Sequence, residues 1–386
     1  MFAAYIFVAL VDIIRCIIAF HTKATLILTQ KNTTNCLHPN YLCNRKPKQQ
    51  PMNRKLTLFL CGIAMFVPHR MTAGNNRTGQ EYLFVYFEGS GEESQQEQLR
   101  FATSTNGFCW KALNGNSPIV DAKNFAESGA IRDPHILRMA DNKGFLMVAT
   151  DMNAIRDGWK YNPGIVMMKS KNLTDWKAIS VNIGKLYPEQ FKDAKWVWAP
   201  QTIYDEKTGK YIVYFSIHFK DESSAFYYAY ANKDFSGFET APKMFFKPSH
   251  LGIDADIIYK DGTYHLFYKT SSTDSNGKET HSGIQQAVSQ NILGPYKELG
   301  EYCDPYAGRP QVEGSCVYQV SDDANKPLYV LMYDIFGGKR YEYVTSTDLY
   351  HFTKKAQRFQ KDFIPRHGTV MGITENELKR LQKRFK

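Results

Sequence analysis

Short apolar runs separated by polar turns occupy most of the chain, and this alternation predicts β-strands. Runs with alternating or β-branched character recur, and turn signals of the hairpin type stand between them. The runs include GFLMVAT (144–150), KYIVYFS (210–216), TYHLFYK (263–269) and PLYVLMY (327–333), and the turns include DNKG (141–144), DEKTGK (205–210) and KDGT (260–263). Helical periodicity is absent from residues 80–370. Only the C-terminal residues have it, and there we expect a short helix over 376–386.

A phrase of small and polar residues that closes on an aromatic occurs five times, at intervals of roughly 60 residues. Its copies are STNGFCW (104–110), SKNLTDW (170–176), ANKDFSGF (231–238), SQNILGPY (289–296) and STDLYHF (346–352). Four-stranded units repeated at this spacing are typical of a β-propeller, so we expect an all-β fold with five blades over residues 80–375. The strands at 81–87 and 99–104 and the last strand at 368–374 lack a complete unit. We expect these N- and C-terminal strands to share one blade and close the ring, which removes exposed sheet edges.

The pattern of the N-terminal region is typical of a targeting signal and not of a folded domain. Residues 52–73 contain a basic start, an apolar stretch at 56–67 and a candidate cleavage site after Ala73, as in a secretory signal peptide, although Met71 is larger than the small residue typical of its position. We therefore expect a secreted or periplasmic protein with no stable membrane span in the mature chain. Residues 1–51 precede this signal, and we expect a leader from a start codon assigned too early, or a disordered segment. A membrane anchor at 2–20 is the alternative, but two charged residues interrupt that run.

The net charge of +10 does not indicate a nucleic-acid partner. Most of it lies in residues 1–73, which hold nine Lys or Arg and a single Asp. The rest of the chain is nearly neutral and lacks the basic footprint of a phosphate-binding protein. Of the seven cysteines, only Cys109, Cys303 and Cys316 lie outside this region, at spacings that give neither a disulfide framework nor a zinc pattern.

Carboxylates stand near the starts of the strands that we expect to line the propeller axis. The five starts are IRDPHI (131–136), VWAPQTI (197–203), GIDADII (252–258), VEGSCVY (312–318) and PRHGTVM (365–371). Three of them supply an acid at matched places: Asp133, Asp254 and Glu313. Like charges in one narrow space repel, so at least one acid should hold its proton more tightly, as general acid catalysis at a glycosidic bond requires. A single Asp or Glu in such a place is most often a solvated turn residue. Three at the starts of inner strands together predict a glycosidase site.

These motifs resemble glycoside hydrolase family 43 over roughly residues 80–375. RDP opens the first unit, WAP (198–200) the second, ID with a DGxY hairpin the third and EG the fourth, and RHGTV stands near the end. The resemblance implies Asp133 as general base, Glu313 as general acid, and Asp254 as the residue that tunes the pKa and orientation of its partner. It also implies inversion at the anomeric carbon, for which base and acid lie roughly 6.5–9.5 Å apart.

Two of these assignments have neighbours that compete with them. Asp256 lies two residues beyond Asp254 on the same face of the strand, and we favour Asp254 because it completes the ID pattern. Glu313 is followed by Gly-Ser where the resembled family often has Gly-Pro. The nearby Glu298 and Glu301 belong to a hydrophilic turn and are expected to face solvent.

Further side chains are candidates for binding the substrate. Aromatic rings stack on sugar rings, with packing inside a blade as the alternative; the candidates are Trp159, Trp196, Trp198 and Tyr333. Charged groups bind sugar hydroxyls, with structural ion pairs as the alternative; the candidates are Arg132, Asp151, Asp334 and Arg366.

In the resembled family a histidine at the place of His367 helps to hold a structural calcium ion, although calcium prefers oxygen ligands. Alternatively, His367 hydrogen-bonds the carboxylates, and no cofactor is expected for the chemistry itself.

The sequence therefore predicts an inverting, exo-acting glycosidase that removes α-L-arabinofuranosyl or β-D-xylosyl residues from plant-type polysaccharides or oligosaccharides, with arabinofuranosidase activity as the first choice. The sugar rests on the family resemblance alone. Endo-arabinanase and exo-galactanase activities stay open, because loop shapes decide between a pocket and a groove. A carbohydrate-binding propeller without catalysis is the alternative from another class, but it would not need three acids near the axis.

Overall fold

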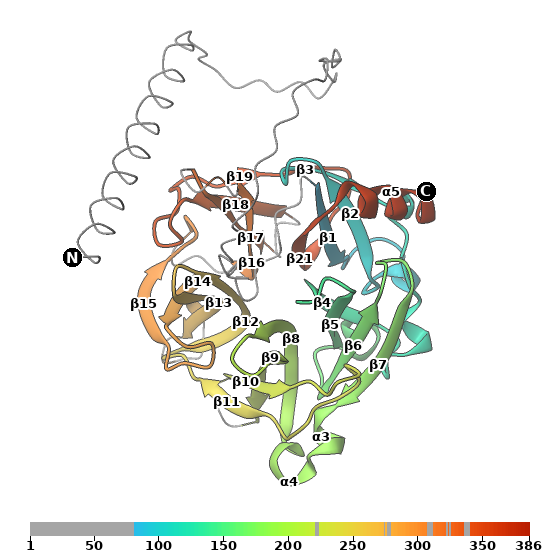
Figure 1. Cartoon of the computed structure of the whole chain (residues 1–386). Helices are drawn as coiled ribbons and strands as arrows, with labels where there is room; N and C mark the ends of the chain where they lie inside the picture. Colours follow the sequence, from blue (N-terminus) through green and yellow to red (C-terminus); the bar gives the residue numbers. More distant parts are fainter. Residues whose placement is uncertain are drawn as a thin grey trace, which may run out of the picture. The chain divides into compact units, whose positions relative to one another are not determined.

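The described part of the chain forms five β-sheets around a common axis (Figure 1). The computed structural model describes residues 81–386, apart from 221–223, 274, 276–278, 307–311, 322, 324–325 and 336–339. The predicted five-bladed all-β propeller is thereby confirmed. The expected leader at 1–51 and signal peptide at 52–73 lie outside the described residues. No helix within the described residues has the length and apolar character needed to cross a membrane.

Four blades are consecutive four-stranded antiparallel sheets, and in each of them the strands follow one another from the axis outward. The first blade contains β4 (Ile131–Arg138), β5 (Phe145–Asp151), β6 (Gly164–Ser170) and β7 (Trp176–Asn182). The second contains β8 (Ala194–Asp205), β9 (Lys210–Phe219), β10 (Ala225–Tyr230) and β11 (Lys243–Phe246). The third contains β12 (Leu251–Lys260), β13 (Thr263–Thr273), β14 (Glu279–Ser289) and β15 (Lys297–Tyr302). The fourth contains β16 (Val312–Ser321), β17 (Leu328–Ile335), β18 (Arg340–Ser346) and β19 (Gln357–Arg358).

The fifth blade joins the two ends of the described chain. Its inner strand is β21 (Arg366–Ile373), which pairs antiparallel with β1 (Glu81–Phe87). Outside β1 follow β2 (Arg100–Ser104), β3 (Cys109–Ala112) and the short β20 (Gln360–Lys361). The predicted closure by N- and C-terminal strands that share a blade is confirmed.

The helices of the described residues are short, and all but the C-terminal one lie in connections between strands. They are the 3₁₀ turns η1 (Glu93–Gln95), η2 (Asn114–Asn116) and η3 (Ala122–Asn124), the one-turn helices α2 (Ala154–Asp157), α3 (Ile183–Leu186) and α4 (Pro188–Phe191), and α5 (Glu375–Arg384).

The repeated phrase is the turn between the third and fourth strands of a blade. In the copies that start at Ser170 and Ser346, the serine hydroxyl accepts the backbone N–H of Leu173 at 3.0 Å and of Leu349 at 2.9 Å. Both leucines have a positive φ, of 69° and 67°. This strained conformation turns each leucine inward, and both are fully buried between neighbouring blades. The phrase therefore recurs because each blade needs one such turn to seal against the next.

The C-terminal helix α5 covers the joint between the fifth and first blades. Thr374 and Glu377 form a reciprocal capping box at its start. Its Leu378, Leu381 and Phe385 side chains join the core cluster between these blades. Glu377 also accepts two hydrogen bonds of 2.7 Å from the Arg138 guanidinium on β4. The helix thus ties the last strand to the first blade through both apolar and charged contacts.

We expect Leu381→Ala to lower the free energy of unfolding by about 2–4 kcal/mol, because the side chain is fully buried and its removal leaves a cavity. Urea denaturation followed by tryptophan fluorescence measures the change. Leu186→Ala, at a leucine that is 55% exposed, is the matched control and should change the free energy little. Equal losses for both variants would contradict the role of α5 as a seal.

Candidate active site

The innermost strand of every blade carries a β-bulge near its start, where two residues face one residue of the second strand. The bulge residues are Asp133 and Pro134 in β4, Ala199 and Pro200 in β8, Asp254 and Ala255 in β12, Gly314 and Ser315 in β16, and His367 and Gly368 in β21. The first of the two has a positive φ in all of these strands except β21. A bulge bends its strand and redirects a side chain. The five bulges together therefore define one level of the axis.

The register of the bulges corrects the expectation that the three acids hold matched places. Asp133 and Asp254 both occupy the first bulge position, with φ of 51° and 58°. Glu313 lies one residue before its bulge and pairs with Asp334 on β17. Its counterparts in the other blades are Arg132, Trp198, Ile253 and Arg366. The acids thus come together from two adjacent levels of the axis. We call the part of the axis formed by Asp133, Asp254, Glu313, Arg366 and His367 the funnel.

Asp133 is fixed by a hydroxyl that is itself fixed by the next blade. Thr150 on β5 donates its hydroxyl to Asp133 Oδ2 at 2.8 Å, and the same hydroxyl accepts the N–H of Ala199 at 2.9 Å. Burial alone would raise the pKa of Asp133, but its hydrogen-bonding and charged neighbours, His367 first among them, lower it below the usual value. The carboxylate is therefore held ionised, as a general base requires.

His367 lies between the two bulge carboxylates. Its Nδ1 is 3.4 Å from Asp133 Oδ1 and 3.8 Å from Asp254 Oδ1. Burial would lower the pKa of His367, but the surrounding carboxylates, chiefly Asp254 and Asp133, raise it to about 9. The imidazole is thus positively charged at neutral pH and offsets the repulsion between the two acids.

Asp254 is held by the backbone of the fourth blade. Its Oδ2 accepts the N–H of Gly314 at 3.0 Å. Gly314 has a φ of 67°, and a Cβ at this position would lie 2.9 Å from Cγ of His367, so both the backbone and the space require glycine. Burial raises the pKa of Asp254, with Glu313 and Asp133 adding to the effect and His367 opposing it. Asp254 therefore binds a proton more readily than Asp133 does.

Glu313 is held by two cationic side chains. Arg366 Nη2 lies 2.7 Å from Glu313 Oε1, and Lys269 Nζ on β13 lies 3.7 Å from Oε2. Arg366 also donates through Nε to Asp334, whose side chain is fully buried. Burial raises the pKa of Asp334, with Arg366 opposing. The predicted binding residues Arg366 and Asp334 thus form one ion-pair network with Glu313.

The residues around His367 do not match a calcium site. Calcium takes six to eight oxygen ligands, whereas the His367 Nδ1 faces two carboxylates in the spacing of an ion pair. Among the described residues, no group of three or more His, Cys, Asp or Glu side chains is arranged to hold a metal ion. The geometry fits the alternative in which His367 hydrogen-bonds the acids.

Aromatic rings line one side of the funnel above the second blade. Trp198 stacks on Trp196 with ring centroids 4.4 Å apart, and Trp196 stacks in turn on His218 at 4.6 Å. Trp159 meets Trp198 edge to face at 5.8 Å and remains 59% exposed. The Arg132 guanidinium lies 4.8 Å from the Trp159 ring. The predicted side chains Trp159, Trp198 and Arg132 therefore share one wall, with a ring face open to solvent.

Two predicted binding residues lie elsewhere. Tyr333 is fully buried in the core cluster of the third and fourth blades, so its ring offers no face to a sugar. The structure therefore supports the alternative for Tyr333, packing inside the propeller, since adjacent residues of a strand point to opposite faces and Asp334 is the one that faces Arg366. Asp151 is also buried, and its carboxylate accepts the N–H groups of Glu127 and Ser128. It shapes a loop instead of facing the acids.

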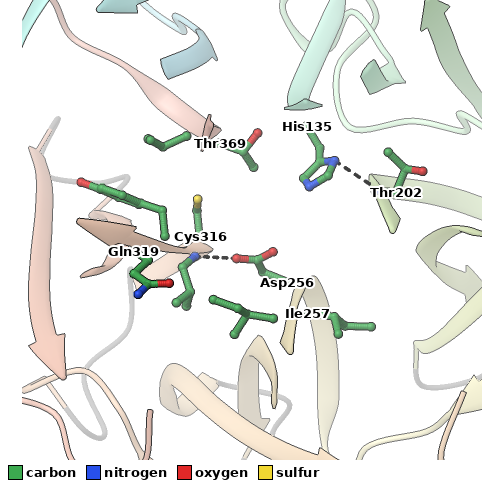
Figure 2. Close-up of a pocket in the computed structure, with 11 residues that line it drawn as sticks. His135, Thr202, Asp256, Ile257, Cys316, Gln319 and Thr369 are labelled. Atoms are coloured by element: carbon green, nitrogen blue, oxygen red, sulfur yellow. Dashed lines mark hydrogen bonds between the residues drawn. The ribbon is translucent and has the colours of Figure 1, made fainter. Parts of the chain in front are cut away.

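The rival carboxylate Asp256 belongs to a different pocket, shown in Figure 2. The pocket lies one step further along the inner strands, and side chains from all five blades line it, including His135, Thr202, Asp256, Cys316 and Thr369. Asp256 accepts the N–H of Val317, and Thr202 N–H donates to His135 Nδ1 at 3.2 Å. Its volume of about 30 Å³ is enough for about two water molecules and too small for a sugar. Asp254, by contrast, lies with His367 in the funnel.

Sequence reasoning missed two polar residues of the site. Thr150 and Lys269 both lie on second strands, opposite the residues that precede the bulges, Arg132 and Ile253. The signal that could have found them is the hairpin register, counted back from the turn. A count without the bulge fails by one residue, because the bulge shifts the register.

The fold and the funnel define a β-propeller glycoside hydrolase. A family model described as a probable glycosyl hydrolase domain, of the group related to glycoside hydrolase family 43, matches residues 78–379. The chain belongs to this family. It is also 23% identical over 249 residues to an α-L-arabinofuranosidase of Bifidobacterium longum subsp. longum. That match covers 59% of this chain but 23% of the relative, so the chain spans about a quarter of that protein's length.

Solved structures share the propeller at low identity. An endo-1,4-β-xylanase of Bacteroides thetaiotaomicron gives a TM-score of 0.50 at 13% identity, over 75% of this chain and 99% of that one. A thermostable family 43 glycoside hydrolase gives 0.51 at 14% identity, over 76% and 96%. A xylan β-1,4-xylosidase of Bacillus halodurans gives 0.50 at 15% identity, over 78% and 58%. At these identities the likeness shows the fold and not the substrate.

We expect Thr150→Val to lower kcat/KM about tenfold or more and to move the acid limb of its pH profile to higher pH. The valine cannot donate to Asp133, so the ionised base loses a stabilising hydrogen bond. A pH series with a chromogenic glycoside that the wild type hydrolyses measures both effects. Thr150→Ser keeps the hydroxyl and should retain the wild-type profile. An unchanged acid limb in Thr150→Val would show that the hydroxyl does not act on the base.

We expect Asp256→Asn to stabilise the protein at high pH and not at low pH. Burial raises the pKa of Asp256 from 3.8 to about 7. The folded state therefore binds the proton more tightly, and the stability that Asp256 contributes is complete below about pH 4 and is lost as the pH rises through 7. The amide does not titrate, so the difference in Tm between variant and wild type should grow between pH 4 and pH 8.

The matched control for this stability test is Asp261→Asn, at an aspartate whose side chain is 83% exposed. Its Tm difference from the wild type should vary little with pH. A constant Tm difference for Asp256→Asn across the same range would mean that the Asp256 carboxyl does not titrate there.

Proposed function

We propose that the protein is an inverting, exo-acting glycoside hydrolase that removes α-L-arabinofuranosyl residues from plant-type polysaccharides or oligosaccharides. The observation that carries this proposal is the convergence of Asp133 and Glu313 on the funnel from two adjacent levels. Asp133 is kept ionised, while Glu313 stands at an adjacent level of the same funnel with cations on both oxygens. A base and a separate acid around one space are what hydrolysis with inversion needs.

In the mechanism we propose, Asp133 takes a proton from a water molecule, and the water oxygen attacks the anomeric carbon. The bond from that carbon to the leaving oxygen breaks on the opposite face, and Glu313 gives its proton to this oxygen. Arg366 and Lys269 then stabilise the Glu313 carboxylate that remains. Asp254 holds the charged His367 imidazole beside Asp133 and so positions it at the base. The mechanism uses these side chains and water, and no cofactor.

The wall of the funnel supports binding of a sugar ring. The exposed Trp159 face and the neighbouring Trp198 are suited to the apolar side of a furanose or pyranose. Arg132, which is paired with Glu97, presents its guanidinium from the same wall. The arabinofuranosidase relative supports arabinose as the first choice. The β-D-xyloside is the second candidate, because xylosidase and xylanase structures share this fold.

Endo-arabinanase and exo-galactanase activities, and a carbohydrate-binding protein without catalysis, remain the competing proposals. A panel of nitrophenyl α-L-arabinofuranoside, β-D-xyloside and β-D-galactoside with arabinan, xylan and galactan separates them. Release of single sugars supports exo action, and release of oligosaccharides supports endo action. Binding without any product would support the non-catalytic protein. We further propose a secreted or periplasmic location, which the pattern at 52–73 supports.

We expect Asp133→Asn to lower kcat about 10² to 10⁴-fold on every substrate, because the attacking water loses its base. Glu313→Gln should lose a similar factor on natural substrates and much less on a dinitrophenyl glycoside, whose leaving group departs without a proton. Initial rates measure the losses, and ¹H NMR of the first product gives the anomer. Full activity in Asp133→Asn, or a first product with the anomeric configuration of the substrate, would refute the mechanism.

A further inference from the structure

A second cavity lies beside the loop between α2 and β6, residues 158–163. Its volume is about 320 Å³, and it is lined by this loop, by the ends of β5 and β6, by α2 and by the start of α3. That volume is at the lower end of the range for small-ligand sites. It exceeds the axial pocket of Figure 2 about tenfold and is large enough for one sugar ring.

The loop carries two exposed aromatic residues, one in contact with the funnel wall and the other lining the cavity. Trp159 contacts Trp198 and Arg132 at the funnel and does not line the cavity. Tyr161, two residues on, lines the cavity and is 57% exposed. A tyrosine ring that is left open beside a cavity is costly to hydrate and suited to stacking. The loop thus offers one ring face to the funnel and another to the cavity.

Asn162 joins the cavity to the funnel wall. It is 8% exposed and lines the cavity. Its Oδ1 accepts the indole N–H of Trp198 at 2.7 Å, and its Nδ2 donates to the backbone carbonyl of Asp151 at 3.4 Å. Asn162 therefore lines the cavity and at the same time fixes the indole of Trp198.

The cavity also presents groups that bind hydroxyls. Its rim is fixed by Lys185 and Asn182, which both bond the Glu127 carboxylate. Within the described part of the chain, the Lys160 ammonium and the Asn153 Nδ2 make no hydrogen bond, so both donors are available to a ligand. An open aromatic face beside free hydrogen-bond donors is the chemistry that recognises carbohydrate.

We propose that this cavity binds a second sugar unit of the substrate whose terminal unit lies in the funnel, with Tyr161 as the stacking platform. The inference rests on the proposed function in taking a carbohydrate chain as substrate. It makes polymeric or branched substrates better than simple glycosides, because only they reach both spaces.

Kinetics with Tyr161→Ala test this site. We expect kcat/KM on nitrophenyl α-L-arabinofuranoside to stay within about twofold of the wild type and kcat/KM on soluble arabinoxylan or branched arabinan to fall about fivefold, which is the loss of one stacking contact. Tyr161→Phe keeps the ring and should keep polymer activity. Met244→Ala, at a methionine on β11 that is 53% exposed, is the control for loss of an exposed apolar side chain and should change neither. Equal losses on both substrates, or no loss on the polymer, would overturn the proposal.

Binding tests the site without any turnover. Affinity electrophoresis in gels that contain soluble arabinoxylan or branched arabinan compares Asp133→Asn with the Asp133→Asn, Tyr161→Ala double variant. Weaker retardation of the double variant supports the cavity as a sugar site even if no hydrolysis is found. Equal retardation, or no retardation of either variant, overturns it. Hydrolysis of the polymers with no effect of Tyr161→Ala would refute sugar binding in the cavity and would leave the proposed function unaffected.

Discussion

Buried negative charge is the constraint around which the funnel is organised. Asp133, Asp254, Glu313 and Asp334 converge there, and like charges in a poorly solvated space repel strongly. His367 compensates the first two and Arg366 the last two. The two cations are neighbours at the start of β21, so one dipeptide balances acids from three different blades. Neutralising His367 would remove the counter-charge that Asp133 and Asp254 share, and neutralising Arg366 would remove that of the buried Asp334, which costs far more than the loss of one surface ion pair.

The bulges explain how strands that are otherwise regular supply this arrangement. A regular strand alternates its side chains between two faces, and the inner strand of a blade needs both faces to pack against its neighbours. Because each bulge adds one residue to the strand, one side chain is not needed for packing against the neighbouring blades. At Asp133 and Asp254 the freed position carries an acid, at His367 the counter-charge, and at Ala199 and Gly314 little or nothing. The last two contribute their backbone N–H groups instead: that of Gly314 donates to Asp254, and that of Ala199 donates to the Thr150 hydroxyl that bonds Asp133.

The architecture was predictable because repetition at a fixed spacing is visible in one sequence. The turns that close on Trp176 and Phe352 recur because each places an apolar side chain between neighbouring blades. The acids stand out because they lie near the starts of three of the five inner strands. The relative level of Glu313 was not predictable, because a one-residue bulge leaves no mark in the pattern of apolar positions. Tyr333 and Asp151 show the same limit, since each is adjacent in sequence to a funnel element yet points elsewhere. Contacts between blades, such as those of Thr150 and Lys269, depend on the pairing register and stay hidden until it is known.

The closure of the ring by β21 has a consequence for biosynthesis. His367 lies on β21, which is made after the blades that carry Asp133 and Asp254. Until β21 pairs with β1, the two acids lack their counter-charge and the axis is open on one side. A nascent chain therefore balances this buried charge only once β21 has been made and has joined the ring.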